Sequence, residues 1–315
     1  MKDKKKLRFC MMRDDLSEPV KLILDELKIT ATEPEEIVKQ LKAMDAKKIT
    51  KALDSNAEKK MLVPTVDGKF HPKNTQKLLE EGKYNPVPYI IGFNNTEGAG
   101  MLGSNFTEDF PKGLSEETAK SIISGMLAEG IPADKLESVN KAVTDFYSKQ
   151  LDDGDKYKWS KVVASYFGDS FFIVPSIGQA IAHSGAGHDT YVYYMTQQPR
   201  MHHDDAYAGK IKPKAVFCEA DHGDDIMLTM GYPLMNCKFI PQAGFSDTEK
   251  KLSKQWMKTI CQFAKTGNPN CDGEKEWPKY DTKKFLELKW PYDVRTDIFE
   301  KRFKFWSEKI PALLK

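Results

Sequence analysis

Long apolar segments are absent from this chain of 315 residues. No apolar run approaches the roughly 20 residues that a membrane-spanning helix needs. The opening Met1–Lys6 is a basic cluster, but it is not followed by the stretch of about 7 to 15 apolar residues that a secretory signal peptide requires. We therefore expect no membrane span, and we recognise no targeting signal in the sequence as written.

An excess of charge of either sign is also lacking. The sequence has 48 basic and 46 acidic residues, which gives a net charge of +2. Such a balance produces no strong field over the whole chain, so we expect no nucleic-acid partner. Internal repeats, low-complexity tracts and Gly/Ser linkers are missing too, which favours one continuous globular chain over a string of modules.

Cysteines with a metal-binding spacing are missing. The five cysteines, an odd number without a C-x-x-C pair, are Cys10, Cys218, Cys237, Cys261 and Cys271. A zinc site or a complete disulfide framework is therefore not expected. Residues 201–205, M-H-H-D-D, invite a metal-site interpretation, but adjacent side chains point in different directions and rarely bind one ion. We interpret this segment as a solvated loop.

Helices dominate what is present. Apolar residues recur at helical spacing in several segments, which are residues 119–127, 136–146, 246–263 and 299–310. Ser246 and Glu249 predict a capping box at the start of the third of these helices. Gly267, with Pro269 just beyond, predicts its end. Another helix is expected over residues 169–183.

Strand candidates are few and short. They are Tyr89–Phe93, Thr190–Met195 and Phe285–Lys289, and each is apolar or aromatic. Because helical segments separate them, they favour a mixed α/β sheet over an all-β fold. The predicted fold class is therefore α/β, with a small sheet for a chain of this length.

Two short segments carry the residues that we single out for chemistry. In residues 87–98, V-P-Y-I-I-G-F-N-N-T-E-G, a buried strand is predicted to place Glu97 at its carboxyl end. In residues 218–225, C-E-A-D-H-G-D-D, His222 lies among four acids. Neighbouring acids favour the imidazolium form, which suits a general base.

Together, these segments resemble the type B carboxylesterase and cholinesterase family of α/β-hydrolases, whose catalytic triad runs Ser, Glu, His along the chain. Further segments resemble the family in the same order: residues 262–270 (Q-F-A-K-T-G-N-P-N), 276–280 (E-W-P-K-Y) and 303–306 (F-K-F-W). The resemblance implies an α/β-hydrolase fold and hydrolysis of carboxylic esters through an acyl-serine intermediate, without metal or cofactor. It implies that Glu97 orients the imidazole and that His222 is the general base.

The nucleophile of that chemistry is not in the sequence. Neither a G-x-S-x-G elbow nor an H-G-G-type oxyanion loop occurs. We therefore expect residues 1–315 to be the C-terminal portion of a single type B carboxylesterase domain, truncated at its N-terminus and inactive as an isolated chain. The expected partners are a small-molecule carboxylic ester in the complete enzyme and the N-terminal half that would bring the serine.

Three other side chains are candidate nucleophiles. Ser170 in G-D-S-F-F has Phe172 where the second glycine of the elbow belongs, and Ser184 in A-H-S-G-A lacks the leading glycine. Both fall inside or at the end of the predicted helix, where an exposed elbow is not available. Nothing around Cys218 is predicted to lower its thiol pKa, so we interpret it as a buried structural cysteine.

The resemblance has further implications. It implies secretion or residence in the endoplasmic reticulum, and a disulfide that would join positions Ile29 and Gln40, which cannot form here. N-glycosylation sequons occur at Asn94 and Asn105, and we expect Asn94 to stay unused because it would lie beside the active site.

Two alternative functions remain open. One is a non-catalytic cholinesterase-like binding or adhesion module, and the other is a genuine short protein that pairs with a separately made N-terminal half. Inactive relatives usually lose triad residues by substitution within a full-length fold. This chain keeps both the acid and the base, which favours a catalytic ancestry.

Overall fold

The computed structural model describes residues 17–56, 64–100, 107–128, 130–202, 214–235, 244–280 and 283–315. The chain divides into two compact units, one of residues 10–83 and one that contains residues 84–315.

The first unit is helical in its described part. Its helices are α1 (Ser17–Glu26), α2 (Pro34–Lys42), α3 (Ala46–Asn56) and α4 (Thr75–Glu80). Pro34 opens α2, where its missing N–H leaves no bond unmade. The buried apolar residues described in this unit are Leu27, Ile29 and Ala52. Ile29, one of the two positions of the family disulfide, is thus a core residue.

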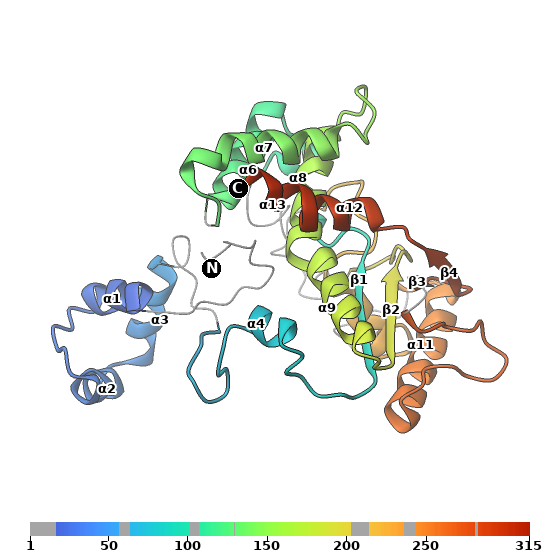
Figure 1. Ribbon diagram of the computed structural model, residues 1–315, viewed down its shortest axis with the longest axis horizontal. Helices are drawn as coiled ribbons and strands as arrows, with labels where there is room; N and C mark the ends of the chain where they lie inside the picture. Colours follow the sequence, from blue (N-terminus) through green and yellow to red (C-terminus); the bar gives the residue numbers. More distant parts are fainter. Residues whose placement is uncertain are drawn as a thin grey trace. The chain divides into compact units, whose positions relative to one another are not determined.

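The second unit is built on a four-stranded sheet (Figure 1). Its strands, in sheet order, are β1 (Tyr89–Asn94), β2 (Thr190–Met195), β3 (Lys284–Leu288) and β4 (Asp293–Thr296). The first three strands are parallel, and β4 pairs antiparallel with β3. The predicted α/β class is confirmed, and the three predicted strands lie within one residue of their expected bounds.

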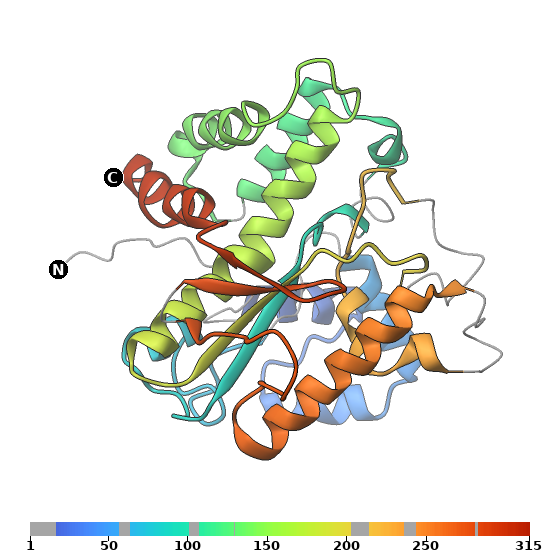
Figure 2. The same cartoon turned by 90° about the vertical axis from the view of Figure 1, so that its right-hand side faces the viewer.

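Helices cover both faces of this sheet (Figure 2). On one face, α9 (Val174–Gly185) packs through Ile177 against Val192 and its neighbours. On the other, α11 (Asp247–Thr266) packs through Trp256 against Tyr193, with 4.9 Å between the ring centroids. A parallel strand buried on both faces needs apolar residues at successive positions, which is why these strands read as continuous apolar runs.

A second group of helices continues from α9. It comprises α6 (Glu116–Leu127), α7 (Ala133–Ser148), α8 (Lys158–Gly168) and the C-terminal α12 (Glu300–Lys304) and α13 (Ile310–Leu313), with the 3-10 turn Phe110–Lys112. The segments Asp169–Ile173 (η2) and Phe305–Lys309 are π-helical. Ile123, Val143 and Trp306 are fully buried in the core that these helices share.

The remaining elements within the described ranges lie between β2 and α11. They are α10 (Asp224–Thr229) and the 3-10 turn Tyr232–Leu234. The predicted capping box is present, because Ser246 accepts the backbone N–H of Glu249 and the Glu249 side chain accepts that of Ser246. Gly267 ends α11 with a φ of 74°, as predicted.

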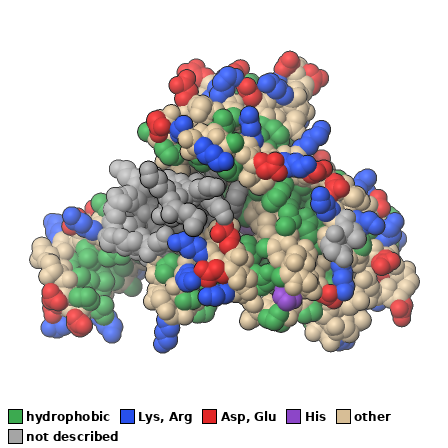
Figure 3. Space-filling view, viewed as in Figure 1, with side chains coloured by type: hydrophobic (Ala, Val, Ile, Leu, Met, Phe, Trp, Pro, Cys, Tyr) green, Lys and Arg blue, Asp and Glu red, His purple; other side chains and the backbone are tan. Residues whose placement is uncertain are grey.

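The surface shows the charge balance of the sequence. Basic and acidic side chains are interspersed on the face seen in Figure 3. Within the described ranges, no helix is both long and apolar enough to cross a bilayer.

Candidate active site

Glu97 lies in the turn that follows β1, at the carboxyl end of the parallel strands. Only 4% of this residue is exposed. The backbone of α8 approaches the turn so closely that a Cβ on Gly98 would lie 2.4 Å from the carbonyl oxygen of Ala164. Gly168 of the same helix faces Glu97, since a Cβ built on it would lie 3.5 Å from the Glu97 Cβ. The absence of a side chain at Gly98 therefore lets α8 pack against the turn that carries the acid.

Both carboxylate oxygens of Glu97 are engaged. Oε1 accepts the backbone N–H of Asn94 at 2.7 Å, and Oε2 lies 2.7 Å from Nδ1 of His222. Burial raises the pKa of the Glu97 carboxyl above its ordinary value, and the hydrogen bond with His222 opposes this shift. The structure thus brings the two predicted site residues, 125 positions apart, into direct contact.

The electrostatics of His222 suit a base that must carry a proton. Its hydrogen bond with Glu97 raises the pKa of the imidazole above its ordinary value, while burial lowers it. The charges of Asp221 and Asp225 add to the rise. The side chain is 45% exposed, and no residue in the described ranges forms a hydrogen bond with its Nε2 atom.

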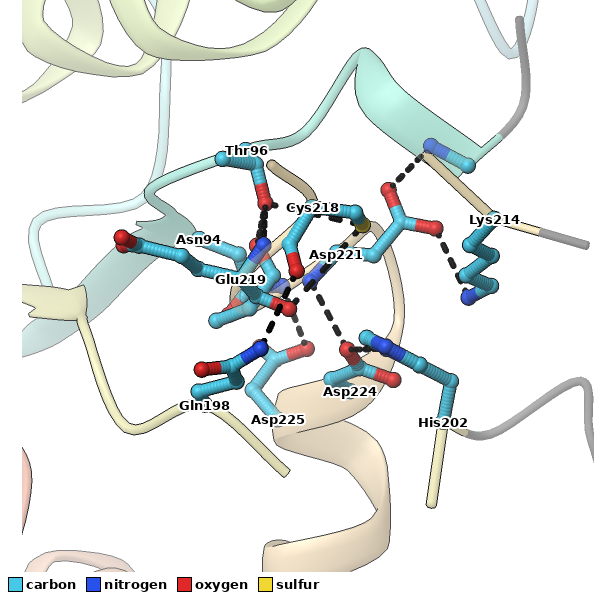
Figure 4. A network of polar contacts seen from close by, with 12 residues as sticks. Asn94, Thr96, Gln198, His202, Lys214, Cys218, Glu219, Asp221, Asp224 and Asp225 are labelled. Carbon is cyan, nitrogen blue, oxygen red and sulfur yellow. Dashed lines mark hydrogen bonds and ion pairs between the residues drawn. The ribbon is translucent and has the colours of Figure 1, made fainter. Parts of the chain in front are cut away.

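The segment that carries His222 is attached to the turn after β1 by a set of local hydrogen bonds (Figure 4). The backbone N–H of Thr96 donates to the carbonyl of Ala220 at 3.0 Å, and the Thr96 hydroxyl donates to the same oxygen at 2.9 Å. That hydroxyl also accepts the N–H of Glu219 at 3.0 Å, and Oδ1 of Asn95 accepts the N–H of Ala220 at 3.0 Å. Asn95 and Thr96, just before Glu97, therefore fix the position of the residues that precede His222.

Two acids of this segment form structural hydrogen bonds. Asp221 accepts the N–H of Gly100 and the ammonium of Lys214, each at 3.0 Å. Asp224 is fully buried and accepts the N–H of Asp221 at 2.7 Å and Nδ1 of His202 at 2.6 Å. The acids around His222 are therefore largely structural, rather than a solvated cluster.

Asp225 connects the segment to two strands. Its carboxylate accepts the side-chain N–H of Asn94 at 3.2 Å and the hydroxyl of Tyr193 on β2. Asn94 is only 1% exposed, and its backbone N–H already contacts Glu97. The sequon at Asn94 is thus a buried structural element, and the sequon at Asn105 lies outside the described residues.

None of the three alternative nucleophiles is presented as a serine elbow would be. The Ser170 hydroxyl lies 3.4 Å from the carbonyl oxygen of Phe167 inside the π-helical segment, and the Ser184 hydroxyl lies at the same distance from that of Ile181 in α9. Cys218 is buried, and burial raises the pKa of its thiol to about 12. Its reactive thiolate form is accordingly scarce at neutral pH.

One histidine of the M-H-H-D-D segment, His202, lies within the described residues. Nδ1 of His202 contacts the buried Asp224, whereas residues 203–205 lie outside the described residues. Among the residues whose placement is described, no group of three or more His, Cys, Asp or Glu side chains could hold a metal ion.

Sequence comparison decides the family. Residues 8–306 match the profile of the Carboxylesterase family. The chain belongs to the carboxylesterase family. Among its curated relatives, carboxylesterase 1E of Rattus norvegicus is 34% identical over 251 residues, and carboxylesterase 1C of Mus musculus is 32% identical over 245 residues. Human carboxylesterase 5A is 27% identical over 288 residues.

The alignments include most of this chain but less than half of each of these carboxylesterases. The alignments include 78%, 77% and 90% of this chain, but only 41%, 41% and 46% of the respective relatives. The chain thus spans less than half the length of the curated relatives that it matches. The mixed, mostly parallel sheet with its surrounding helices agrees with membership of this α/β-hydrolase family.

Proposed function

We propose that this chain supplies the acid and the base for the hydrolysis of carboxylic esters by a serine mechanism. In this proposal Glu97 orients the imidazole and His222 takes the proton from a serine hydroxyl. The relatives are named carboxylesterases, which supports carboxylic esters as the substrate class.

One observation carries the proposal, namely the 2.7 Å contact between Glu97 Oε2 and His222 Nδ1. A carboxylate at Nδ1 keeps the proton on that nitrogen and leaves the lone pair on Nε2, where a serine hydroxyl can donate. The negative charge also stabilises the imidazolium that forms when the proton is taken. A non-catalytic binding module gives no reason to bury an acid against a half-exposed imidazole.

The proposal includes an incomplete site. The 315 residues contain neither a G-x-S-x-G elbow nor an H-G-G-type loop, and acyl transfer needs both a nucleophile and oxyanion donors. We propose that a segment bearing the serine elbow, equivalent to the N-terminal half of a carboxylesterase, completes the site.

The first prediction concerns the chain by itself. The purified protein should hydrolyse short activated esters no faster than its Glu97→Gln/His222→Ala double variant, because no nucleophile is present for the base to activate. Initial rates over a range of enzyme concentrations measure this. Ester turnover that disappears in the double variant would contradict the incomplete site and would direct attention to Ser170, Ser184 and Cys218.

The second prediction restores the serine. When the chain is joined to the serine-bearing half of a related carboxylesterase and turnover appears, His222→Ala should lower kcat by roughly 10⁴-fold or more, because an unassisted serine is a weak nucleophile. Glu97→Gln should cost on the order of 10⁴, by analogy with the acid-to-amide change in serine proteases. The double variant should be little worse than His222→Ala alone, since such residues act as a unit.

A matched control for this experiment is Glu117→Gln. Glu117 is exposed on the first turn of α6, and the same acid-to-amide change there should leave kcat within about twofold. A joined enzyme that keeps near-full activity with Glu97→Gln would show that the acid is wrongly assigned.

A further inference from the structure

The His222 imidazole has a second neighbour besides Glu97. The ring of Phe172 lies against it, with 4.5 Å between the ring centroids and 38° between the ring planes. The hydrogen bond at Nδ1 restrains rotation of the imidazole about its Cβ–Cγ bond through one contact only, so some rotational freedom remains. A packed ring on one face removes this freedom, because catalytic side chains keep their geometry only when their rotamers are locked by their surroundings.

The backbone that presents Phe172 is unusual. Residues 169–173 form a π-helical turn between α8 and α9, and such turns occur frequently at functional sites. Asp169, at the start of the turn, is fully buried. It accepts the Tyr147 hydroxyl at 2.7 Å and an Nη1 hydrogen of Arg302 at 3.2 Å. The turn is thus anchored to α7 and α12 by a buried carboxylate.

The same short stretch of helix lies against both Glu97 and His222, which we call the dyad. Gly168, one residue before the π-helical turn, faces the Glu97 Cβ, and Phe172 within the turn contacts His222. Helical neighbours two positions apart point in nearly opposite directions, so Ser170 is directed away from the imidazole that Phe172 contacts. The stretch from Gly168 to Phe172 therefore sets the position of the acid and the orientation of the base together.

We propose that Phe172 is a positioning residue for His222. Its ring holds the plane of the imidazole so that Nδ1 faces Glu97 while Nε2 stays available to a serine. The catalytic meaning of this contact rests on the proposed function, but the contact exists in the chain alone and is measurable there without ester turnover.

The test uses NMR of the whole chain with isotopically labelled histidine. The imidazole proton shared with Glu97 is assigned by its loss in His222→Gln, and its exchange with water is measured. Phe172→Leu should speed this exchange by roughly three- to tenfold, the range expected for loss of one aromatic pair. Phe172→Met, which keeps an apolar side chain but removes the ring, should do the same. Phe172→Tyr keeps the ring and should restore the wild-type rate.

Phe171→Leu is the matched control. It makes the same change in the same turn, but Phe171 stacks on Phe167 at 4.6 Å rather than on His222. The melting temperature of the Phe171→Leu variant reports any general loosening of the turn. The His222 proton of this variant should exchange within about twofold of the wild-type rate.

Two results would overturn the inference in distinguishable ways. If the histidine proton is present but responds to Phe172→Leu and Phe172→Met no more than to Phe171→Leu, the positioning role fails and the dyad stands. If the ¹⁵N chemical shifts of the labelled imidazole show a neutral His222 with its proton on Nε2, the hydrogen bond between Glu97 and His222 is absent, and the proposed function fails together with this inference.

Discussion

At the scale of single residues, the proposed chemistry depends on one hydrogen bond between a buried acid and a half-exposed imidazole. Glu97 raises the pKa of His222, and the partial burial of the ring lowers it. The pKa of His222 therefore depends chiefly on Glu97, a partner that a single substitution can remove.

The third prediction follows from this balance. Glu97→Gln removes a negative charge but keeps the shape and burial of the side chain, so the pKa of His222 should fall. Histidine NMR titration measures the change, with Glu117→Gln as the control that leaves the titration unmoved. An unchanged His222 pKa in Glu97→Gln would mean that the neighbouring acids, rather than Glu97, stabilise the imidazolium.

Sequence patterns could single out the two members of the dyad, but not the residues that hold them. Glu97 follows an apolar strand and His222 lies among acids, and both features are local. Asp224 belongs to that same group of acids, yet it is fully buried and bonds to His202, 22 positions away. The contact of Asn94 with Asp225 joins residues 131 positions apart, which no periodicity or motif reports. The signal that was available was the run of small polar residues directly before Glu97.

At the scale of elements, the close approach of α8 to the acid's turn provides the fourth prediction. Gly98→Ala would place a methyl group 2.4 Å from the Ala164 carbonyl, so α8 must move, and overpacking of this kind typically destabilises by about 1–3 kcal/mol. Thermal or urea unfolding measures the loss.

Gly125→Ala is the matched control in α6. Nothing lies within 4 Å of its added Cβ, and alanine in a helix interior is more stable than glycine by roughly 0.5–1 kcal/mol. The two substitutions should thus change stability in opposite directions. Equal changes in stability would show that the turn at Gly98 accommodates a methyl group, and that the close approach of α8 does not fix the position of Glu97.

Regular elements were predictable where their apolar pattern was strong. The three parallel strands and α11 follow from apolar runs and a capping box. Strand β4 was not predicted, since its four residues, Asp293–Thr296, are polar except for one valine and half of them are exposed. The expected helix over 169–183 is helical throughout, but the π-helical turn at its start, which is bonded to the distant Tyr147 and Arg302, was not predicted.

At the scale of the whole molecule, the two compact units differ in how much they bury. Tyr191 and Val192 in β2 are at most 1% exposed, whereas α2 of the other unit contains no buried residue. The expectation that residues 1–315 belong to a single domain stays a prediction. Family membership was predictable from the motifs around Glu97 and His222 and is confirmed by the match over residues 8–306.

The fifth prediction uses this difference. Amide hydrogen exchange in β2 should be slower than in α2 by about two orders of magnitude or more, because protection follows buried contacts and small cores open readily. Exchange measured by mass spectrometry resolves both segments, with β4 as an internal reference of intermediate exposure. Similar protection in β2 and α2 would mean that the units unfold as one.

The burial of Asn94 has a consequence for how the chain would mature in a cell. An oligosaccharide can be attached only while that amide is accessible, yet the folded protein encloses it and bonds it to Asp225. Attachment and folding therefore exclude each other. A chain that bears an oligosaccharide at Asn94 cannot close the turn around Glu97. The fraction of chains glycosylated at this position would therefore equal a fraction of chains that failed to fold.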